Sequence, residues 1–333
     1  HNPTNQALEE LVTALEGGAG TLATASGMAG IQIAIQAALT DRRKCILASN
    51  ALYGASISLL HMVLEPFGID VNYVDISDTA ATLQKIEKLQ PGCVLMETIS
   101  NPLLRVGEVD KIAEAAKKAG ACLIVDNTFA TPLLLRPLEL GANIVVHSGT
   151  KFMSGHGDML GGFVTCDEEH LEPVRTLSRV YGPVLGPFSA YLAMRGIKTF
   201  PLRMERQCQN AASVFEALKK NPRIKTIHYT GDPSHPDATV INRLIPGSLK
   251  GAMLSFEIDG ADREKVFAFI NRLKMIVPAT SLGDVHTMIL YPAMSSHREV
   301  SPKQRERMGI TESLLRLSVG IEAVEDIIDD LNQ

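Results

Sequence analysis

The stretch Ile144-Val145-Val146-His147-Ser148-Gly149-Thr150-Lys151 joins a short apolar run to a polar segment that ends in a lysine. The apolar part predicts a buried strand. A lysine directly after such a strand can reach the cleft at the carboxyl edge of a parallel sheet. The hydroxyls at 148 and 150 suit a phosphate group, because each can donate to a phosphate oxygen. Taken alone, the segment fits a surface lysine in a polar loop about equally well.

Short apolar runs alternate with amphipathic stretches over the first two thirds of the chain. The expected strands are Thr21–Ala25, Cys45–Ala48, Val71–Val74, Cys93–Met96, Cys122–Val125 and Ile144–Val146. The expected helices between them include Ile31–Leu39, Ala81–Leu89 and Val109–Ala119. Such alternation predicts an α/β fold with a mostly parallel sheet covered on both faces.

The pattern changes after about residue 200. The expected elements there are a long helix at Arg203–Leu218, a Pro/Gly/His-rich loop at Gly231–Gly247, strands at Ala252–Ile258, Thr287–Leu290 and Leu314–Ser318, and helices at Arg263–Leu273 and Glu322–Leu331. These elements predict an α+β unit with antiparallel strands. Since 333 residues exceed what one hydrophobic core supports, we expect a large domain over 1–200 and a smaller one over 201–333, reached through the long helix.

Composition narrows the classes of partner. The net charge is −5 and no block of Lys or Arg stands out, which argues against nucleic acid or an anionic membrane as partner. The apolar runs are too short to cross a bilayer. Five cysteines without C-x-x-C or His/Cys ligand spacing argue against a disulfide framework and a structural metal, and favour a reducing cytoplasm. The chain opens at His1 without an initiator Met, so we expect the natural N-terminus to lie upstream.

A carboxylate follows a second apolar strand, in Val125-Asp126-Asn127-Thr128. It is expected at the same edge of the sheet as Lys151. Pyridoxal phosphate needs such a carboxylate to keep its pyridine nitrogen protonated. By itself, a strand-end Asp is more often a helix N-cap or a turn residue.

Other segments add weaker signals. Ala25-Ser26-Gly27-Met28 between a strand and a helix suits an anion, though Ser-Gly is also a plain helix cap. Tyr53 could stack on a flat cofactor or simply pack. Arg316 between apolar residues suits a substrate carboxylate or a structural ion pair. His147 and His156 are interpreted as packing or supporting residues, because no G-x-S-x-G or H-E-x-x-H motif is present.

Several motifs occur together in one order along the chain. They are Asn2-Pro3-Thr4, Ala25-Ser26-Gly27, Leu52-Tyr53-Gly54, Glu97-Thr98, Asn101-Pro102, Val125-Asp126-Asn127-Thr128, Ser148-Gly149-Thr150-Lys151, Ser281-Leu282-Gly283 and Arg316-Leu317-Ser318. In this order they resemble the Cys/Met-metabolism family of pyridoxal-phosphate enzymes. The resemblance implies the aspartate-aminotransferase-type fold (fold type I), and a homotetramer built from dimers with shared active sites.

The resemblance also implies roles for individual residues. Lys151 would hold pyridoxal 5'-phosphate as a Schiff base, Asp126 would pair with the ring nitrogen, and Tyr53 would stack on the ring and assist proton transfer. Further cofactor contacts are implied for Ser26, Gly27, Met28, Thr128, Ser148 and Thr150, with the phosphate on the backbone of 27 and 28 and the hydroxyls of 148 and 150. Asn101, Ser281 and Arg316 would face the substrate carboxylate or the cofactor's 3-oxygen.

Three positions depart from the patterns of particular subfamilies. A Tyr-x-Arg that precedes Asn-Pro-Thr in the family lies outside the given sequence. Thr280 stands where many cystathionine synthases and γ-lyases carry Glu, and Ala55 stands where typical methionine γ-lyases carry Cys. Neither subfamily is therefore matched cleanly.

The function expected from these motifs is a carbon–sulfur lyase that acts on a sulfur amino acid by γ-elimination. The nearest alternative is a γ-replacement enzyme that uses an activated homoserine. A non-catalytic cofactor-binding protein is disfavoured, because a binder has no need of a substrate clamp such as Arg316.

Overall fold

The computed structural model describes residues 2–39, 43–295, 305 and 309–333. The chain divides into two compact units. Unit 1 comprises His1–Ile99 and Val106–Lys198, and unit 2 comprises Ser100–Arg105 and Thr199–Gln333. The sequence does not indicate that the short segment Ser100–Arg105 belongs with the C-terminal part of the chain.

Unit 1 is built on a seven-stranded sheet in the order β1-β7-β6-β5-β4-β2-β3. The strands are β1 (Gly20–Thr24), β2 (Cys45–Ser49), β3 (Asp70–Val74), β4 (Cys93–Glu97), β5 (Cys122–Asp126), β6 (Ile144–Ser148) and β7 (Gly162–Cys166). Neighbouring strands from β3 to β6 are parallel, whereas β7 is antiparallel to both β6 and β1. The carboxyl ends of β1 and of β2 to β6 therefore lie at one edge of the sheet.

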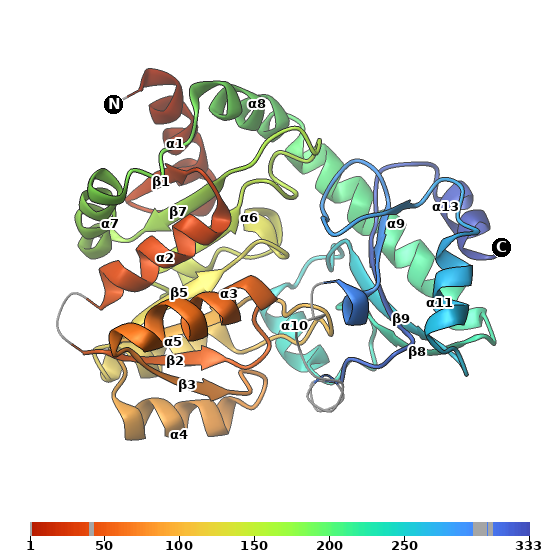
Figure 1. Cartoon of the computed structure of the whole chain (residues 1–333), viewed down its shortest axis with the longest axis horizontal. Helices are drawn as coiled ribbons and strands as arrows, with labels where there is room; N and C mark the ends of the chain where they lie inside the picture. Colours follow the sequence, from red (N-terminus) through yellow and green to blue (C-terminus); the bar gives the residue numbers. More distant parts are fainter. Residues whose placement is uncertain (1, 40–42, 296–304, 306–308) are drawn as a thin grey trace. The chain divides into compact units, whose positions relative to one another are not determined.

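Helices lie on both faces of this sheet (Figure 1). They are α1 (Pro3–Glu16), α2 (Gly27–Ala38), α3 (Gly54–Ser58), α4 (Thr79–Leu89), α5 (Val109–Lys118), α6 (Thr131–Leu134), α7 (Glu168–Tyr181) and α8 (Pro187–Ile197), with the short helical segments η1 (Leu59–Leu64), η2 (Glu65–Phe67) and η3 (Pro137–Leu140). Side chains of α2, η1 and α7 share one core cluster with alternate residues of the central strands. Side chains of α1 and α8 form another cluster with Phe163 of β7.

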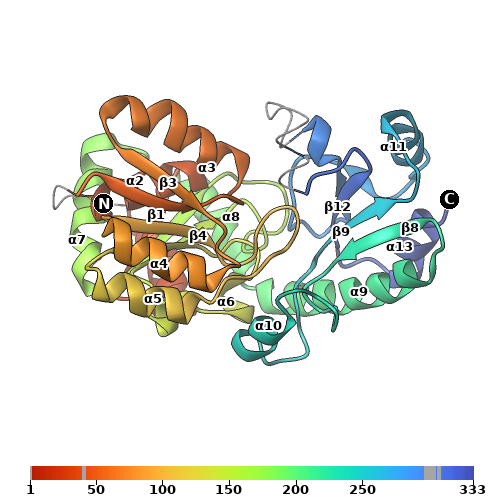
Figure 2. The same ribbon diagram turned by 90° about the horizontal axis from the view of Figure 1, so that it is seen from below.

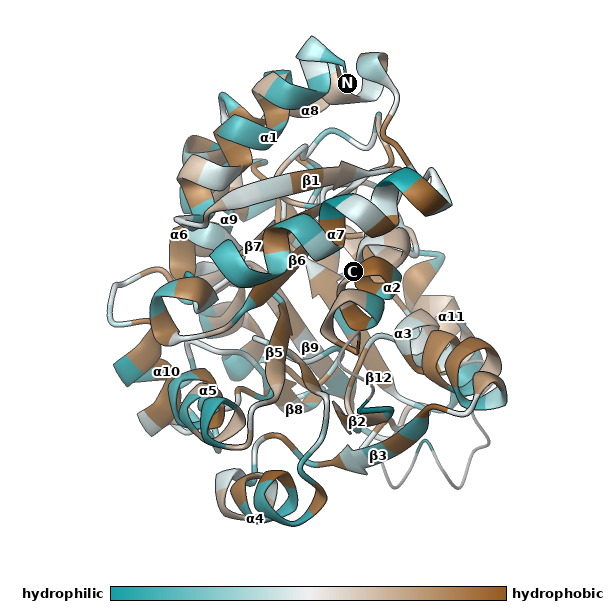
Figure 3. Ribbon diagram, turned by 90° about the vertical axis from the view of Figure 1, so that its left-hand side faces the viewer, coloured by the Kyte–Doolittle hydropathy of each residue, from teal (hydrophilic) through white to brown (hydrophobic). Residues whose placement is uncertain are grey.

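Alternation along β6 decides which residues face which layer. Ile144 and Val146 belong to the core under α2, so Ser148 points to the same side and His147 to the other. Strand β5 is buried almost throughout and is mostly brown in the hydropathy colouring of Figure 3. A parallel strand covered on both faces needs such a continuous apolar run.

All six strands that the sequence predicts in this region are confirmed, with ends shifted by no more than two residues. Strand β7 and helices α1, α7 and α8 are not predicted. The apolar signal of β7 is weak, because only Phe163 and Val164 are bulky and apolar between Gly162 and Thr165. The mostly parallel α/β character is confirmed.

Unit 2 contains a five-stranded sheet in the order β10-β11-β12-β9-β8. Its strands are β8 (Ile224–His228), β9 (Met253–Ile258), β10 (Val277–Pro278), β11 (Met288–Leu290) and β12 (Leu314–Ser318). Its helices are α9 (Phe200–Lys220), α10 (Ala238–Leu244), α11 (Arg263–Ile270) and α13 (Val324–Leu331), with the short segment η4 (Pro292–Met294). Figure 2 shows α9 running beside β8 and β9, and its apolar side chains share the core of this sheet.

The three strands expected in unit 2 pair antiparallel with one another, as predicted. The two-residue strand β10 is not predicted, and it pairs with β11 in parallel. One expectation for unit 2 is wrong. The segment Gly231–Gly247 is not only loop, because it contains α10, in which Ile241 and Leu244 are buried three residues apart. Pro and Gly residues surround this short helix, so the three-residue spacing of its apolar side chains is too brief to detect in the sequence.

No helix among the described residues combines the length and apolar character that crossing a membrane requires. All five cysteines are free thiols.

Candidate active site

The motifs of unit 1 gather at the carboxyl edge of its sheet. Asp126 is the last residue of β5 and lies opposite Val146 of the parallel neighbour β6. Lys151 lies in the turn that follows β6, and its backbone N–H donates to the carbonyl of Ser148 at 3.1 Å. Tyr53 directly precedes α3 in the connection after β2, and Ser26 precedes α2 after β1.

The N-terminus of α2 forms a cradle against the end of β6. Ser26 caps the helix, since its hydroxyl oxygen accepts from the N–H of Ala29 at 3.1 Å. A Cβ added at Gly27 would lie 3.1 Å from Cα of Ser148, so the two segments touch here and a side chain would crowd them. The amides of Gly27 and Met28 precede the first intrahelical bonds, and the first turn carries no acidic residue. These features are those of an anion site.

Asp126 is held in place by one neighbour. Both the N–H and the hydroxyl of Thr128 donate to Oδ1 of Asp126, at 3.0 and 2.5 Å. The same hydroxyl oxygen accepts from the N–H of Ser148 at 2.9 Å, which ties the two strand ends together. Oδ2 of Asp126 receives no hydrogen bond from the described residues. Burial raises the pKa of Asp126 above its ordinary value, while the bonds from Thr128 and the charge of His147 act in the opposite direction.

The turn that carries Lys151 is fixed by backbone bonds. The N–H of Gly155 donates to the carbonyl of Lys151 at 2.8 Å. The hydroxyl oxygen of Thr150 accepts from the N–H of Gly161 at 3.2 Å. A Cβ at Gly149 would lie 2.6 Å from the ring of Phe163, so only glycine fits at that position. The turn thus has little freedom, and Lys151 starts from a defined place.

Tyr53 presents its ring at the surface, with 44% of the residue exposed. Its backbone N–H donates to Oε1 of Glu97, the last residue of β4, at 2.5 Å. Glu97 of the Glu97-Thr98 motif therefore anchors the loop after β2 through this hydrogen bond. An exposed ring on an anchored backbone is suited to stacking.

Three predicted substrate residues meet inside unit 2. Arg316 of β12 is 2% exposed, and its NH1 donates to Oδ1 of Asn101 at 3.0 Å. NH2 of Arg316 donates to the carbonyl of Ser281 at 3.2 Å. The side chain of Arg316 is therefore oriented by the other two residues before any substrate binds.

The segment Ser100–Arg105 is fastened to unit 2 by further bonds. The hydroxyl of Ser255 donates to the carbonyl of Pro102 at 2.7 Å. Arg105 donates from Nε and NH2 to both carboxylate oxygens of Asp237, at 2.7 and 2.8 Å. Sequence reasoning missed Arg105 and Asp237, because nothing local marks two residues 132 positions apart as partners.

Thr280, at the position where many relatives carry Glu, is exposed. The neighbouring acid that could replace that Glu, Asp284, is 7% exposed. Oδ1 of Asp284 accepts from the N–H of His286 at 3.3 Å. Asp284 is thus turned into unit 2 and is a poor substitute for an exposed acid at 280.

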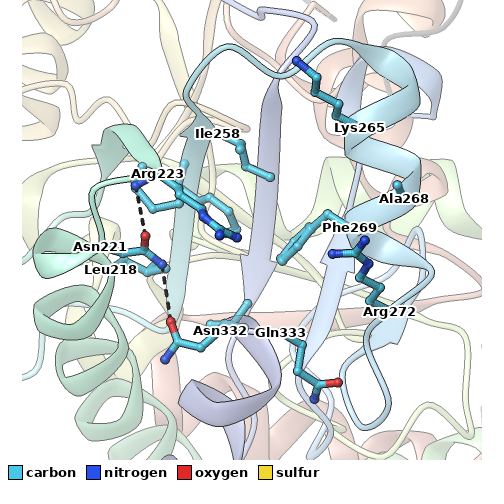
Figure 4. Close-up of a pocket in the computed structure, with 13 residues that line it drawn as sticks. Leu218, Asn221, Arg223, Ile258, Lys265, Ala268, Phe269, Arg272, Asn332 and Gln333 are labelled. Carbon is cyan, nitrogen blue, oxygen red and sulfur yellow. Dashed lines mark hydrogen bonds between the residues drawn. The ribbon is translucent and has the colours of Figure 1, made fainter.

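A pocket of about 240 Å³ lies elsewhere in unit 2 (Figure 4). Phe256, Phe269 and Leu331 contribute apolar surface to it, and Arg223 and Arg272 contribute charge. Asn221 bridges its wall by accepting from the N–H of Arg223 at 3.0 Å and donating to Asn332 at 3.3 Å. None of the predicted site residues lines this pocket.

Comparison with known proteins agrees with the motifs. The model of the family described as Cys/Met metabolism PLP-dependent enzyme matches residues 1–333. An L-methionine gamma-lyase of Fusobacterium nucleatum subsp. polymorphum is 41% identical over 335 residues, which cover 100% of this chain and 84% of that protein. A cystathionine gamma-lyase of Bacillus subtilis (strain 168) is 40% identical over 333 residues, covering 100% and 86%.

A solved structure is similar over the same length. The cystathionine gamma-lyase from Lactobacillus plantarum, complexed with L-serine, superimposes with a TM-score of 0.94 at 37% identity, covering 99% of this chain and 85% of that one. The fold type I architecture that the sequence predicts is thereby confirmed.

Proposed function

The chain belongs to the Cys/Met metabolism PLP-dependent enzymes, and from that premise we propose that it cleaves sulfur amino acids by γ-elimination as a carbon–sulfur lyase. One observation carries the proposal. Asp126, the Lys151 turn and the N-terminus of α2 are joined through Ser148 and Thr128 at one edge of the sheet. Relatives of this chain include a methionine and a cystathionine gamma-lyase.

The residues present fit pyridoxal 5'-phosphate, the cofactor of the family. The phosphate suits the α2 cradle, where Gly27 leaves no side chain between the helix amides and Ser148. The ring nitrogen suits Oδ2 of Asp126, the oxygen that Thr128 leaves open. Tyr53 is proposed to stack on the ring. When bound, the protonated ring draws electron density from the α-carbon of the substrate and acidifies its proton.

The side chains of this chain then have distinct tasks. Lys151 would hold the cofactor covalently, and its amine, when free, would accept the proton from the α-carbon of the substrate. A second proton would pass from the β-carbon to the amine of Lys151, after that amine has passed the first proton on to the bound cofactor, as the bond between the γ-carbon and sulfur breaks. The hydroxyl of Tyr53 is the proposed donor of the proton that the departing sulfur takes up.

Arg316 is proposed to bind the carboxylate of the substrate. A buried guanidinium that Asn101 and Ser281 already orient meets a carboxylate with little loss of side-chain entropy. Two N–H groups of one guanidinium that meet the two oxygens of a carboxylate would favour amino acids over the corresponding amines, which lack that carboxylate.

We also propose that the enzyme is a homotetramer with shared active sites and works in the cytoplasm. An apolar patch on unit 1 supports the assembly. It consists of the exposed side chains of Val180, Tyr181, Val184, Phe188 and Tyr191. Exposed apolar surface of this kind is typical of an interface. The five free thiols support a reducing compartment.

The test is a product assay on the purified, cofactor-loaded enzyme. Methionine and cystathionine should each yield 2-oxobutyrate, whereas pyruvate from cystathionine would indicate cleavage on the β side. O-acetylhomoserine with a thiol acceptor serves as the control for γ-replacement. If that pair gives a thioether while methionine and cystathionine give no keto acid, the lyase proposal is wrong.

A further inference from the structure

The turn Ser100–Arg105, which carries Asn101, closes on itself through hydrogen bonds. The N–H of Ser100 donates to the carbonyl of Arg105 at 2.9 Å, and the N–H of Leu104 donates to the carbonyl of Ser100 at 3.0 Å. The N–H of Arg105 donates in return to the hydroxyl oxygen of Ser100 at 2.9 Å. Because the two ends of the turn are tied together, the position of Arg105 also determines that of Asn101.

Unit 2 holds this turn at two points. At the first point, the hydroxyl of Ser255 donates to the carbonyl of Pro102 at 2.7 Å, and Ser255 lies opposite Arg316 in the register of β9 and β12. At the second point, Arg105 donates from Nε and NH2 to the two carboxylate oxygens of Asp237, at 2.7 and 2.8 Å. Two parallel bonds of this kind fix the direction of a side chain as well as its distance.

The carboxylate of Asp237 serves the turn instead of its own helix. Asp237 is the N-cap residue of α10, a position where an Asp side chain ordinarily accepts from N–H groups of the first helical turn. The side chain makes no such bond here. It is buried and meets Arg105, a residue 132 positions earlier in the chain. The helix thus forgoes a stabilising cap, so local structure does not explain this placement, whereas the contact with Arg105 does.

Arg105 supplies the charge that the buried carboxylate of Asp237 needs. His235 also lies nearby, with Nδ1 3.9 Å from Oδ2 of Asp237. That nitrogen accepts from the N–H of Asp237 at 3.0 Å, so it carries no proton. Burial lowers the pKa of His235 below its ordinary value, which keeps the imidazole neutral at about pH 7. The cation paired with Asp237 is therefore the guanidinium of Arg105.

We propose that Asp237 is a positioning residue for the carboxylate of the substrate. Through Arg105 it holds the turn that carries Asn101, and Asn101 accepts from NH1 of Arg316 at 3.0 Å. The inference rests on the proposed function, in which Arg316 binds the substrate carboxylate. A turn that is no longer held would let the guanidinium of Arg316 move. Binding would then have to order that side chain, and the affinity for carboxylate ligands would fall.

The experiment compares two ligands that differ only by a carboxylate. Norleucine has no leaving group on its γ-carbon, and pentylamine is the same molecule without the carboxylate. Spectroscopic titration of the full, cofactor-loaded chain gives the dissociation constant of each. Asp237→Asn should weaken the binding of norleucine about tenfold, the effect of ordering one or two long side chains on binding, and should change that of pentylamine less than about twofold.

Two further variants control for charge and for folding. Asn caps a helix as well as Asp does, so Asp237→Asn should preserve α10. Asp232→Asn removes the same charge from the same loop, but Asp232 accepts from the N–H and the hydroxyl of Ser234, so both ligands should bind as in the wild type. Arg105→Lys keeps the charge and loses the paired bonds, so it should also weaken norleucine alone. It is the second route should Asp237→Asn fold poorly.

Arg316→Gln separates this inference from the proposed function. It should remove the preference for norleucine over pentylamine. If the preference persists, the assignment of Arg316 is wrong and the inference falls with it. If Arg316→Gln removes the preference while Asp237→Asn leaves the affinity for norleucine unchanged, only the positioning role is wrong. Equal weakening of both ligands by Asp237→Asn would indicate a merely structural role and would also overturn the inference.

Discussion

Thr128 shows how much one side chain can organise at the scale of a residue. Its hydroxyl donates to Asp126 and its oxygen accepts from the N–H of Ser148. The strand-end carboxylate and the turn that leads to Lys151 therefore keep a fixed spacing. A hydroxyl engaged on both sides is a support for Asp126, and a direct contact of Thr128 with the cofactor stays a prediction.

Lys151→Ala tests the covalent attachment at this scale. The wild-type protein loaded with cofactor should be yellow, and borohydride should fix the cofactor on Lys151. The variant should lose both the fixed adduct and turnover, because no other amine is proposed to take the α-carbon proton. Peptide mass spectrometry locates the adduct, and an adduct on a different lysine would contradict the site assignment.

Thr280→Glu tests substrate preference. Cystathionine carries a distal ammonium that methionine lacks, and the exposed Thr280 offers it no charge. A charge-assisted contact contributes about 1.5–3 kcal/mol, and exposure favours the lower end, so kcat/KM for cystathionine over methionine should rise about tenfold. Thr280→Gln is the uncharged control. A wild type that already prefers cystathionine a hundredfold, unchanged in Thr280→Glu, would contradict this explanation.

At the scale of elements, helix ends and short connections do most of the positioning. The N-terminus of α2 packs tightly against β6 at Gly27, where an added Cβ would lie 3.1 Å from Cα of Ser148. In unit 2, α13 anchors the segment before β10, since the carboxylate of Asp330 accepts from the N–H groups of Lys274, Met275 and Ile276 at 2.8 to 3.0 Å. One acidic side chain thus replaces the hydrogen bonds that a regular element would supply.

The contribution of Asp330 to stability should depend on pH, and the Asp330→Asn variant tests this. Burial alone raises the pKa of Asp330, but the three backbone N–H donors outweigh it and hold the pKa below its ordinary value. A lowered pKa stabilises the fold above the unfolded-state value of about 4, and this stability is lost as pH falls through the folded-state pKa. Chemical denaturation should therefore find wild type more stable than the variant at pH 7, with the difference shrinking below about pH 4.

The matched control for this prediction is Asp329→Asn on the same helix. Asp329 is exposed, and within the described part of the chain no backbone N–H donates to its side chain. Its substitution should change the free energy of unfolding by less than about 0.5 kcal/mol at any pH. The contrary outcome is a difference in free energy of unfolding between wild type and Asp330→Asn that stays constant from pH 7 to pH 3. That result would exclude ionisation of the Asp330 carboxylate as the cause of the difference.

At the scale of the whole molecule, five apolar side chains near the ends of α7 and α8 are exposed to solvent. They are Val180, Tyr181, Val184, Phe188 and Tyr191. Phe188 is 71% exposed, and its ring stacks on that of Tyr191 with centroids 6.5 Å apart. Water is an unfavourable neighbour for such a pair of rings. A second copy of the chain is the partner that the proposed homotetramer supplies.

Phe188→Glu should therefore shift the protein to smaller assemblies. A buried, unpaired carboxylate in an interface costs several kcal/mol, enough to raise the dissociation constant at least a hundredfold. Light scattering after size exclusion gives the mass, with Lys88→Glu on the exposed face of α4 as the control for added negative charge. An unchanged mass at micromolar concentration would rule the patch out as the interface.

The sequence alone predicts what depends on neighbours along the chain. The strands β1 to β6 follow from local apolar runs, and Ser26, Asp126 and Lys151 follow because the residue after a parallel strand must lie at one edge of the sheet. The order of these motifs also predicts the family, which the comparisons confirm. The helix α10 and the parallel pair β10–β11 are exceptions, since short elements among Pro and Gly leave little period to detect.

Tertiary structure alone decides which distant residues become partners. The pairs Arg105–Asp237 and Glu16–His147 join positions 132 and 131 residues apart, and neither leaves a trace in its local sequence. The resemblance implies that Arg316 and Asn101 both face the substrate, but only the folded structure shows their direct hydrogen bond, which helps to fasten Ser100–Arg105 to unit 2. The physical reason is that hydrophobic periodicity encodes which face of an element is buried, whereas the identity of the polar group that meets a buried charge is fixed only when the chain has packed.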